Sequence, residues 1–125
     1  MATVNFGLKE GGQMELKERK EGKVLIIKLL EKRLDEPVSA DFKETIAEFV
    51  KRGNESIVLN LSEVNFVDSS GLGSIISSMK MLGRKEDFAI CGMQETVLNL
   101  FRITKMDKLF KIFPDEKEAV AALSK

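Results

Sequence analysis

The chain contains no histidine, no tryptophan, no tyrosine and a single cysteine, Cys91, among its 125 residues. Without histidine it cannot build a Ser-His-Asp or Cys-His catalytic centre, and one cysteine cannot supply a thiolate metal site. One cysteine also excludes an internal disulfide, which points to a reducing compartment. The composition therefore gives no indication of an enzyme, and we expect no cofactor and no bound metal.

The chain also lacks an excess of either charge, because 20 lysine and arginine residues balance 20 aspartate and glutamate residues. Duplex nucleic-acid binders normally carry a clear basic excess, and no tryptophan or tyrosine is available to stack on bases. Apolar runs such as residues 24–27 are far shorter than the ~20 residues that cross a bilayer. The N-terminus shows no targeting pattern. We expect a cytoplasmic protein that binds neither nucleic acid nor membrane.

What is present is the composition of one globular domain, with 43% apolar and 32% charged residues. Strand and helix patterns alternate along most of the chain. This alternation predicts an α/β sandwich with a mixed β-sheet, its later strands parallel, and about four helices. The order of the strands in the sheet does not follow from the pattern.

The expected elements are delimited by apolar runs and capping residues. Strands are expected at residues 14–20, 24–30, 56–61, 88–91 and 109–113. Helices are expected to begin near Asp35, Asp68, Gln94 and Asp115, and the first two to end at Gly53 and Gly83. Residues 1–13 form a separate N-terminal segment, either an extra strand carrying Val4, Phe6 and Leu8 or a tail, and residues 14–125 form the domain.

Residues 68–73, Asp-Ser-Ser-Gly-Leu-Gly, combine sequence and expected structure into a candidate site. A helix begins there, so its free amides and the positive end of its dipole face Ser69 or Ser70. Such a terminus accepts a phosphate group well, and the added charge would act on whatever docks there. Spacing alone favours a plainer hypothesis, in which Asp68 or Ser69 caps the helix and Gly71 and Gly73 permit close packing.

Other candidate sites are weaker. The segment 71–73 lacks the third glycine of a dinucleotide-binding loop, and no Gly-Lys-Ser/Thr sequence follows a strand. Asp35, Glu36 and Asp68 could be imagined around Mg²⁺, but capping and solvation explain these carboxylates better. Cys91 lies in a short apolar strand and is expected to be a small buried hydrophobe rather than a nucleophile.

The order of these features resembles the STAS domain family, to which the bacterial anti-sigma factor antagonists belong. The resemblance is carried by Leu34-Asp35, by the strand at 57–61, and by residues 66–73, Phe-Val-Asp-Ser-Ser-Gly-Leu-Gly. Residues 97–104 and 109–112 look like the third helix and last strand of that family. The resemblance covers about residues 14–123 and implies a STAS-like sandwich.

In that family the first serine after the aspartate is phosphorylated by an anti-sigma factor that is also a serine kinase, so the resemblance points to Ser69. The unphosphorylated antagonist binds the kinase and frees the sigma factor for transcription, whereas the phosphorylated form releases the kinase. A PPM-type phosphatase resets the switch. ATP and Mg²⁺ belong to the kinase, so the resemblance implies no cofactor and no catalytic residue in this chain.

The resemblance also implies a partner surface around Ser69. Asp68 matches the family aspartate and is expected to position the serine hydroxyl, and Ser70 matches a second hydroxyl position expected to cap the helix. The residues expected at this surface are Asp35, Asp68, Ser70, Gly71, Ser74, Ser77 and Ser78. The last three are placed on the outer face of the helix, where simple solvation would explain them equally well.

One departure from the family pattern concerns Lys32, which stands where members commonly have glycine, two residues before the Leu-Asp pair. It leaves the partner and the docking geometry open. Two other functions also stay open. One is a STAS accessory subunit of a transport or signalling complex in which Ser69 is never phosphorylated. The other is a small hydrolase or transferase using Asp68 and Ser69, against which the absence of histidine argues.

Overall fold

The computed structural model describes residues 2–6 and 14–124, and within these the main sheet has the strand order β1-β2-β3-β5-β7-β8. Its strands are β1 (Ala2–Phe6), β2 (Met14–Glu21), β3 (Val24–Leu29), β5 (Ser56–Asn60), β7 (Phe88–Cys91) and β8 (Lys111–Phe113). The pairs β1/β2 and β2/β3 are antiparallel, and the pairs β3/β5, β5/β7 and β7/β8 are parallel. The predicted mixed sheet with later parallel strands is confirmed.

Central strands of the sheet are buried on both faces. Every residue of β5 and β7 is buried, which explains the apolar runs at residues 57–59 and 88–91. In β2, which lies next to the edge strand β1, Met14 and Leu16 are buried while Glu15 between them is exposed. The register places Ile57 between Leu25 and Phe88, so side chains of the same face meet across three strands.

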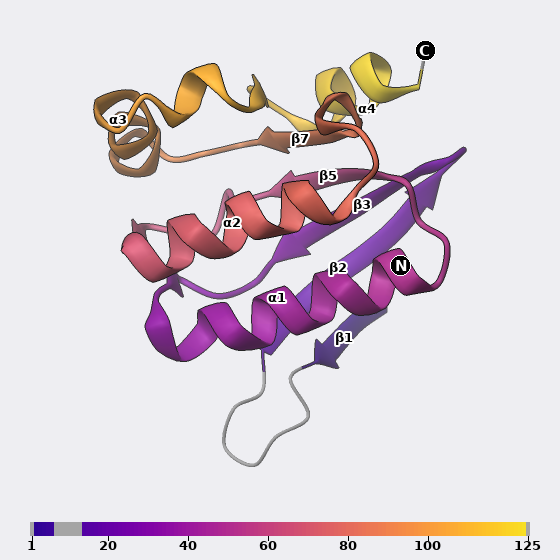
Figure 1. Ribbon diagram of the computed structural model, residues 1–125, viewed down its shortest axis with the longest axis horizontal. Helices are drawn as coiled ribbons and strands as arrows, with labels where there is room; N and C mark the ends of the chain where they lie inside the picture. Colours follow the sequence, from indigo (N-terminus) through magenta and orange to yellow (C-terminus); the bar gives the residue numbers. More distant parts are fainter. Residues whose placement is uncertain (1, 7–13, 125) are drawn as a thin grey trace.

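Four helices cover the sheet among the described residues, as the sequence predicts. They are α1 (Glu36–Lys51), α2 (Ser69–Met81), α3 (Glu95–Ile103) and α4 (Glu116–Leu123), with short 3₁₀ turns η1 (Lys85–Asp87) and η2 (Met106–Lys108). Figure 1 shows α1 and α2 running side by side from the same end over one face of the sheet. Helix α3 adds Val97 and Phe101 to the core under them. Helix α4 packs Ala119 and Leu123 on the opposite face.

A second, two-stranded sheet lies where α1 and α2 begin. Strands β4 (Arg33–Leu34) and β6 (Phe66–Val67) pair in parallel, with Leu34 opposite Val67. Two residues leave no hydrophobic period, so this pairing could not be predicted from the sequence. A single residue separates each strand from the helix that follows it, Asp35 before α1 and Asp68 before α2. The pairing of β4 with β6 therefore brings the starts of α1 and α2 together.

The element boundaries differ from the expected ones mainly before the last strand. That strand begins at Lys111 rather than at residue 109, because Met106–Lys108 form η2 and Leu109 keeps helical backbone angles. Residues 2–6 pair with β2 along the register Ala2 to Glu18. Leu8, expected in the extra strand, lies outside the described residues.

Candidate functional site

The carboxylate of Asp68 joins the starts of α1 and α2. Its Oδ1 accepts a hydrogen bond of 2.8 Å from the Gly71 amide, and its Oδ2 accepts one of 3.2 Å from the Glu36 amide. The first amides of any helix lack partners within the helix, and a negative charge there is also favoured by the helix dipole. One side chain therefore caps two helices, and the hypothesis that Asp68 caps α2 is confirmed.

Asp35 does not supply the cap predicted for α1. Its carboxylate accepts a hydrogen bond of 2.9 Å from Arg33 Nε, and the guanidinium of Arg33 lies 4.2 Å from the centroid of the Phe66 ring. That prediction was wrong because Arg33, two residues earlier, holds the carboxylate. Of the two amides that an N-cap side chain usually accepts from, Pro37 has no N–H and Val38 donates to the main-chain carbonyl of Asp35 at 2.9 Å. Asp35 still lies beside Asp68, since the Asp68 amide donates to the Leu34 carbonyl at 3.3 Å.

Ser69 and Ser70 are the first residues of α2, and both are exposed. No side-chain or main-chain group of the described residues engages either hydroxyl. The expectation that Ser70 caps the helix is wrong, because Asp68 occupies that position and Ser70 lies inside the first turn. Both serines therefore offer a free hydroxyl at the positive end of a helix.

Gly71 was expected at the partner surface, but it is buried against the second small sheet. A Cβ atom on Gly71 would lie 2.0 Å from the carbonyl oxygen of Leu34, closer than any real contact. This confirms close packing at Gly71 and removes it from the exposed surface. The prediction of close packing is wrong for Gly73, because a Cβ added there would meet no atom within 4 Å.

Ser74 and Ser78 were expected on the outer face of α2, and this was wrong. They are 1% and 0% exposed, because this side of α2 faces α1. Their hydroxyls donate to the Gly71 carbonyl at 2.6 Å and to the Ser74 carbonyl at 2.8 Å. A serine that bonds to its own helix can be buried at little cost. Only Ser77 of the three is partly exposed.

A groove of about 490 Å³ runs between α1 and α2. It is lined by Glu36, Ser39, Ala40 and Lys43 from α1 and by Ser70, Gly73, Ser74 and Ser77 from α2. Three of the residues expected at the partner surface, Ser70, Ser74 and Ser77, therefore line one groove, which begins at Ser70, the residue after Ser69. The structure thus brings the predicted residues together in a different arrangement, with a concave surface instead of an outer helix face.

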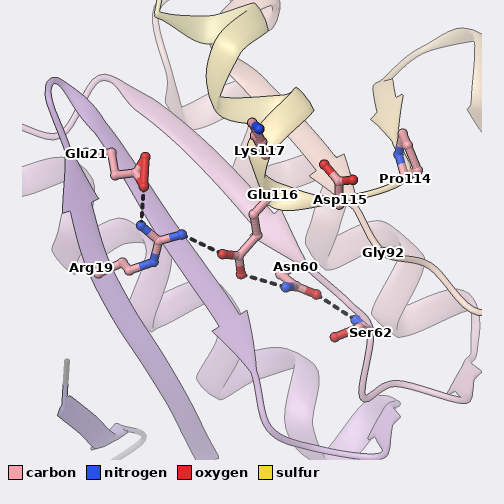
Figure 2. A pocket seen from close by; sticks show the side chains of 9 residues that line it. All are labelled: Arg19, Glu21, Asn60, Ser62, Gly92, Pro114, Asp115, Glu116 and Lys117. Atoms are coloured by element: carbon pink, nitrogen blue, oxygen red, sulfur yellow. Dashed lines mark hydrogen bonds and ion pairs between the residues drawn. The ribbon is translucent and has the colours of Figure 1, made fainter.

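A larger cavity of about 750 Å³ lies on the opposite face of the sheet, against α4 (Figure 2). Arg19 donates to Glu21 and, at 2.7 Å, to Glu116. Asn60 Nδ2 donates to the other Glu116 oxygen at 2.6 Å, and Asn60 Oδ1 accepts from the Ser62 amide at 2.8 Å. These groups bond mainly to one another, and they tie β2, β5 and α4 together.

The charges of this network support each other. Burial would raise the pKa of Glu116, but the hydrogen bonds from Asn60 and Arg19 and the charges of Arg19 and Lys28 outweigh it and lower that pKa. The hydrogen bonds to Glu21 and Glu116 raise the pKa of Arg19. Sequence reasoning missed this network, whose members are far apart in the chain. The one available signal was Asn60, a polar residue that ends an apolar strand.

The described part of the chain shows neither a cluster of metal ligands nor a reactive thiol. No group of three or more histidine, cysteine, aspartate and glutamate side chains within residues 14–124 is placed to hold a metal ion. Cys91 is buried as predicted, and burial raises the pKa of its thiol to about 12. None of the helices described is both long and apolar enough to span a bilayer.

Comparison with known proteins identifies the family of the chain. Residues 15–119 match the model of the STAS domain. The anti-sigma F factor antagonist of Paenibacillus polymyxa is 36% identical over 103 residues, which is 81% of this chain and 85% of that protein.

Solved structures share the fold. An anti-sigma factor antagonist from Mycobacterium paratuberculosis has a TM-score of 0.81 at 19% identity, and the match covers 94% of this chain and 100% of that chain. The Bacillus cell fate determinant SpoIIAA in its phosphorylated form has a TM-score of 0.63 at 19% identity, over 85% and 96% of the two chains. Since the domain match spans residues 15–119 of the 125, this chain belongs to the STAS domain family.

Proposed function

We propose that this protein is an anti-sigma factor antagonist whose binding to an anti-sigma factor is controlled by phosphorylation of Ser69. The observation that carries the proposal is the exposed, unengaged hydroxyl of Ser69 at the first position of α2, directly after the capping Asp68. The relative from Paenibacillus polymyxa, similar over most of both chains, bears that name. A member of the same fold from Bacillus has been solved in a phosphorylated form.

Phosphorylation requires no catalytic group from this chain. The partner, an anti-sigma factor with serine kinase activity, would bring ATP and Mg²⁺ and transfer the γ-phosphoryl group to Ser69 Oγ. The hydroxyl proton leaves, and ADP is released. Asp68 already accepts two main-chain hydrogen bonds, so its role here is to fix the backbone that presents Ser69. It acts as a positioning residue and not as a base.

The phosphate would change the affinity for the partner more than it changes the fold. It adds roughly 1.5 to 2 negative charges at neutral pH. The amino end of α2 tolerates that charge, while a partner carboxylate at ~5 Å would be repelled by ~3 kcal/mol per unit charge at an effective dielectric of ~20. Since ~1.4 kcal/mol is tenfold in affinity, one phosphate weakens binding by about a hundredfold or more.

The proposed switch then has two states, unphosphorylated and phosphorylated. The unphosphorylated protein binds the anti-sigma factor, which releases the sigma factor for transcription. The phosphorylated protein lets the anti-sigma factor go, and a PPM-type phosphatase returns the protein to its binding form. The groove between α1 and α2 supports this proposal because it offers a concave surface that begins at Ser70, the residue after Ser69.

The test is the intact mass of the protein after incubation with ATP, Mg²⁺ and the serine kinase encoded nearest to it. We expect one added phosphate, located on Ser69 by peptide mapping. It should be lost in Ser69→Ala and kept in Ser70→Ala, which removes the neighbouring exposed hydroxyl. No phosphate from a kinase that is active on another substrate would contradict the proposal. That result would favour a STAS accessory subunit, to be sought by pull-down of its complex.

A further inference from the structure

Gly73 occupies the interior of α2 although nothing in the fold requires a glycine there. A Cβ at this position would meet no heavy atom within 4 Å. The backbone of Gly73 is also ordinary, because the glycines with positive φ among the described residues are Gly22, Gly53 and Gly92. Glycine is among the poorest helix formers and is second only to proline in weakening a helix interior. For the isolated chain, alanine would therefore be the better residue.

Gly71 shows what a glycine required by the fold looks like. It lies two residues earlier in the same helix, and a Cβ there would overlap the Leu34 carbonyl oxygen at 2.0 Å. The two glycines of the Asp-Ser-Ser-Gly-Leu-Gly segment thus have different causes. Gly71 is explained by a contact inside the molecule, whereas the space above Gly73 lies outside it.

The open side of Gly73 faces the groove between α1 and α2, where Ala40 lies on the other wall. Both helices start at the carboxylate of Asp68, and Figure 1 shows them running in the same direction. Glu36 therefore lies at the end next to Ser70, and Lys43 lies about 10 Å away, given a rise of 1.5 Å per residue. The groove is about two helical turns long, acidic at the Ser69 end and basic at the other.

A partner that fits this groove must match its shape and its charges. Ala40 on α1 and Gly73 on α2 have small side chains or none, so both sides of the groove are shallow near its middle. This shape suits the close approach of a helix packed along the groove. The charges fit a helix with a cationic side chain toward Glu36 and an anionic one toward Lys43. A bulky side chain at position 73 would project into this groove, whose lining includes Gly73, and would take up space that a partner helix needs.

We infer that Gly73 is a specificity-determining residue whose missing side chain lets a helix of the anti-sigma factor partner lie in the groove between α1 and α2. This inference rests on the proposed function, because it names the surface through which the unphosphorylated protein binds. It goes beyond that proposal because it does not involve the charge on Ser69. Binding should therefore depend on position 73 even when no phosphate is present.

The test compares Gly73→Ala and Gly73→Gln with a matched control, Gly83→Gln. A Cβ at Gly83 also meets nothing within 4 Å, and Gly83 lies beyond the far end of α2, away from the groove. Each full-length variant is titrated with the purified kinase of the phosphorylation experiment, in the absence of ATP, and its Tm is measured. We expect Gly73→Ala to raise Tm by a few degrees. Gly73→Gln should stay folded but bind at least tenfold more weakly, and Gly83→Gln should bind like wild type.

Two results would overturn the inference. One is a folded Gly73→Gln variant that binds within twofold of wild type. The other is a Tm of Gly73→Ala well below wild type, which would show that the fold itself requires the glycine. Failure of the proposed function gives a different pattern, because wild type and Ser69→Ala would then both fail to bind the kinase, whatever residue stands at position 73.

Discussion

The carboxylate of Asp68 accepts a hydrogen bond from the main-chain amide of Glu36, a residue 32 positions earlier in the chain. Its other oxygen accepts from Gly71 within its own helix. The amino end of α2, which begins at Ser69, is therefore tied both to the start of α1 and to its own first turn. Ser69, the residue proposed to be phosphorylated, is therefore presented on a fixed backbone, which would reduce the ordering that docking of a partner requires.

Asp68→Ala should destabilise the protein by about 2 kcal/mol, because it removes two helix caps that contribute about 1 kcal/mol each. Asp68→Asn keeps only one acceptor oxygen and so should retain about half of that stability. Urea unfolding at neutral pH measures both. Equal losses for the two variants would show that only one of the two hydrogen bonds contributes.

Gly71→Ala should be more destabilising than most single substitutions, because its Cβ would lie 2.0 Å from the Leu34 carbonyl oxygen. Either α2 or the strand pair β4/β6 must move, which is expected to cost about 1 to 3 kcal/mol as in other overpacked sites. The measurement is Tm, with Gly83→Ala as the control for the loss of glycine. A Gly71→Ala variant as stable as that control would contradict the close approach.

The fold could be predicted from the sequence where an apolar pattern extends over several residues. The prediction failed where a strand is too short to show such a pattern, and where a polar side chain was assumed to be exposed. The runs at β3, β5 and β7 and the caps at Asp68 and Asp115 carry local signals, and Asp115 indeed accepts a hydrogen bond from the Glu118 amide at 2.9 Å. The pair β4/β6 has no such signal, because each strand has two residues.

The position of the candidate site at the start of α2 could be predicted from the sequence, but the arrangement of the serines around it could not. Ser69 follows its aspartate at the start of a helix, as the local pattern predicts. Ser74 and Ser78 were misplaced because a polar residue was equated with exposure, whereas each hydroxyl bonds to a carbonyl of its own helix. Only the position of α1 decides which side of α2 is covered, and that is tertiary information.

Stability at acid pH should depend on Glu116, whose folded-state pKa lies below its ordinary value of 4.5. Between the two values the unfolded chain binds more protons than the folded one, so stability falls as the pH falls. This contribution is fully present above about pH 5 and is lost as the pH falls through the folded pKa. Glu116→Gln should flatten this part of the stability profile measured by urea unfolding. Exposed Glu48, changed to Gln, is the control, and equal slopes for the two variants would contradict the prediction.

The thiol of Cys91 should resist alkylation in the folded protein, because burial raises its pKa to about 12 and excludes the reagent. At about pH 8 the thiolate is then a fraction on the order of one in ten thousand. Mass spectrometry after iodoacetamide treatment should show unmodified native protein and complete modification in denaturing urea. Rapid labelling without denaturant would show that the strand pair β5/β7 opens readily.

Ser69→Asp tests how much of the proposed switch is charge alone. One negative charge at the first position of α2 is favoured by the helix dipole, so Tm should stay the same or rise slightly. Binding to the kinase should weaken by about tenfold or more, though less than with a phosphate, which carries roughly 1.5 to 2 charges. Lys80→Gln is the matched control, because it changes the net charge by the same amount on an exposed residue in the last turn of the same helix. If both variants weaken binding equally, the effect belongs to the net charge of the protein and not to Ser69. If Ser69→Asp binds like wild type, the added charge is not what releases the partner.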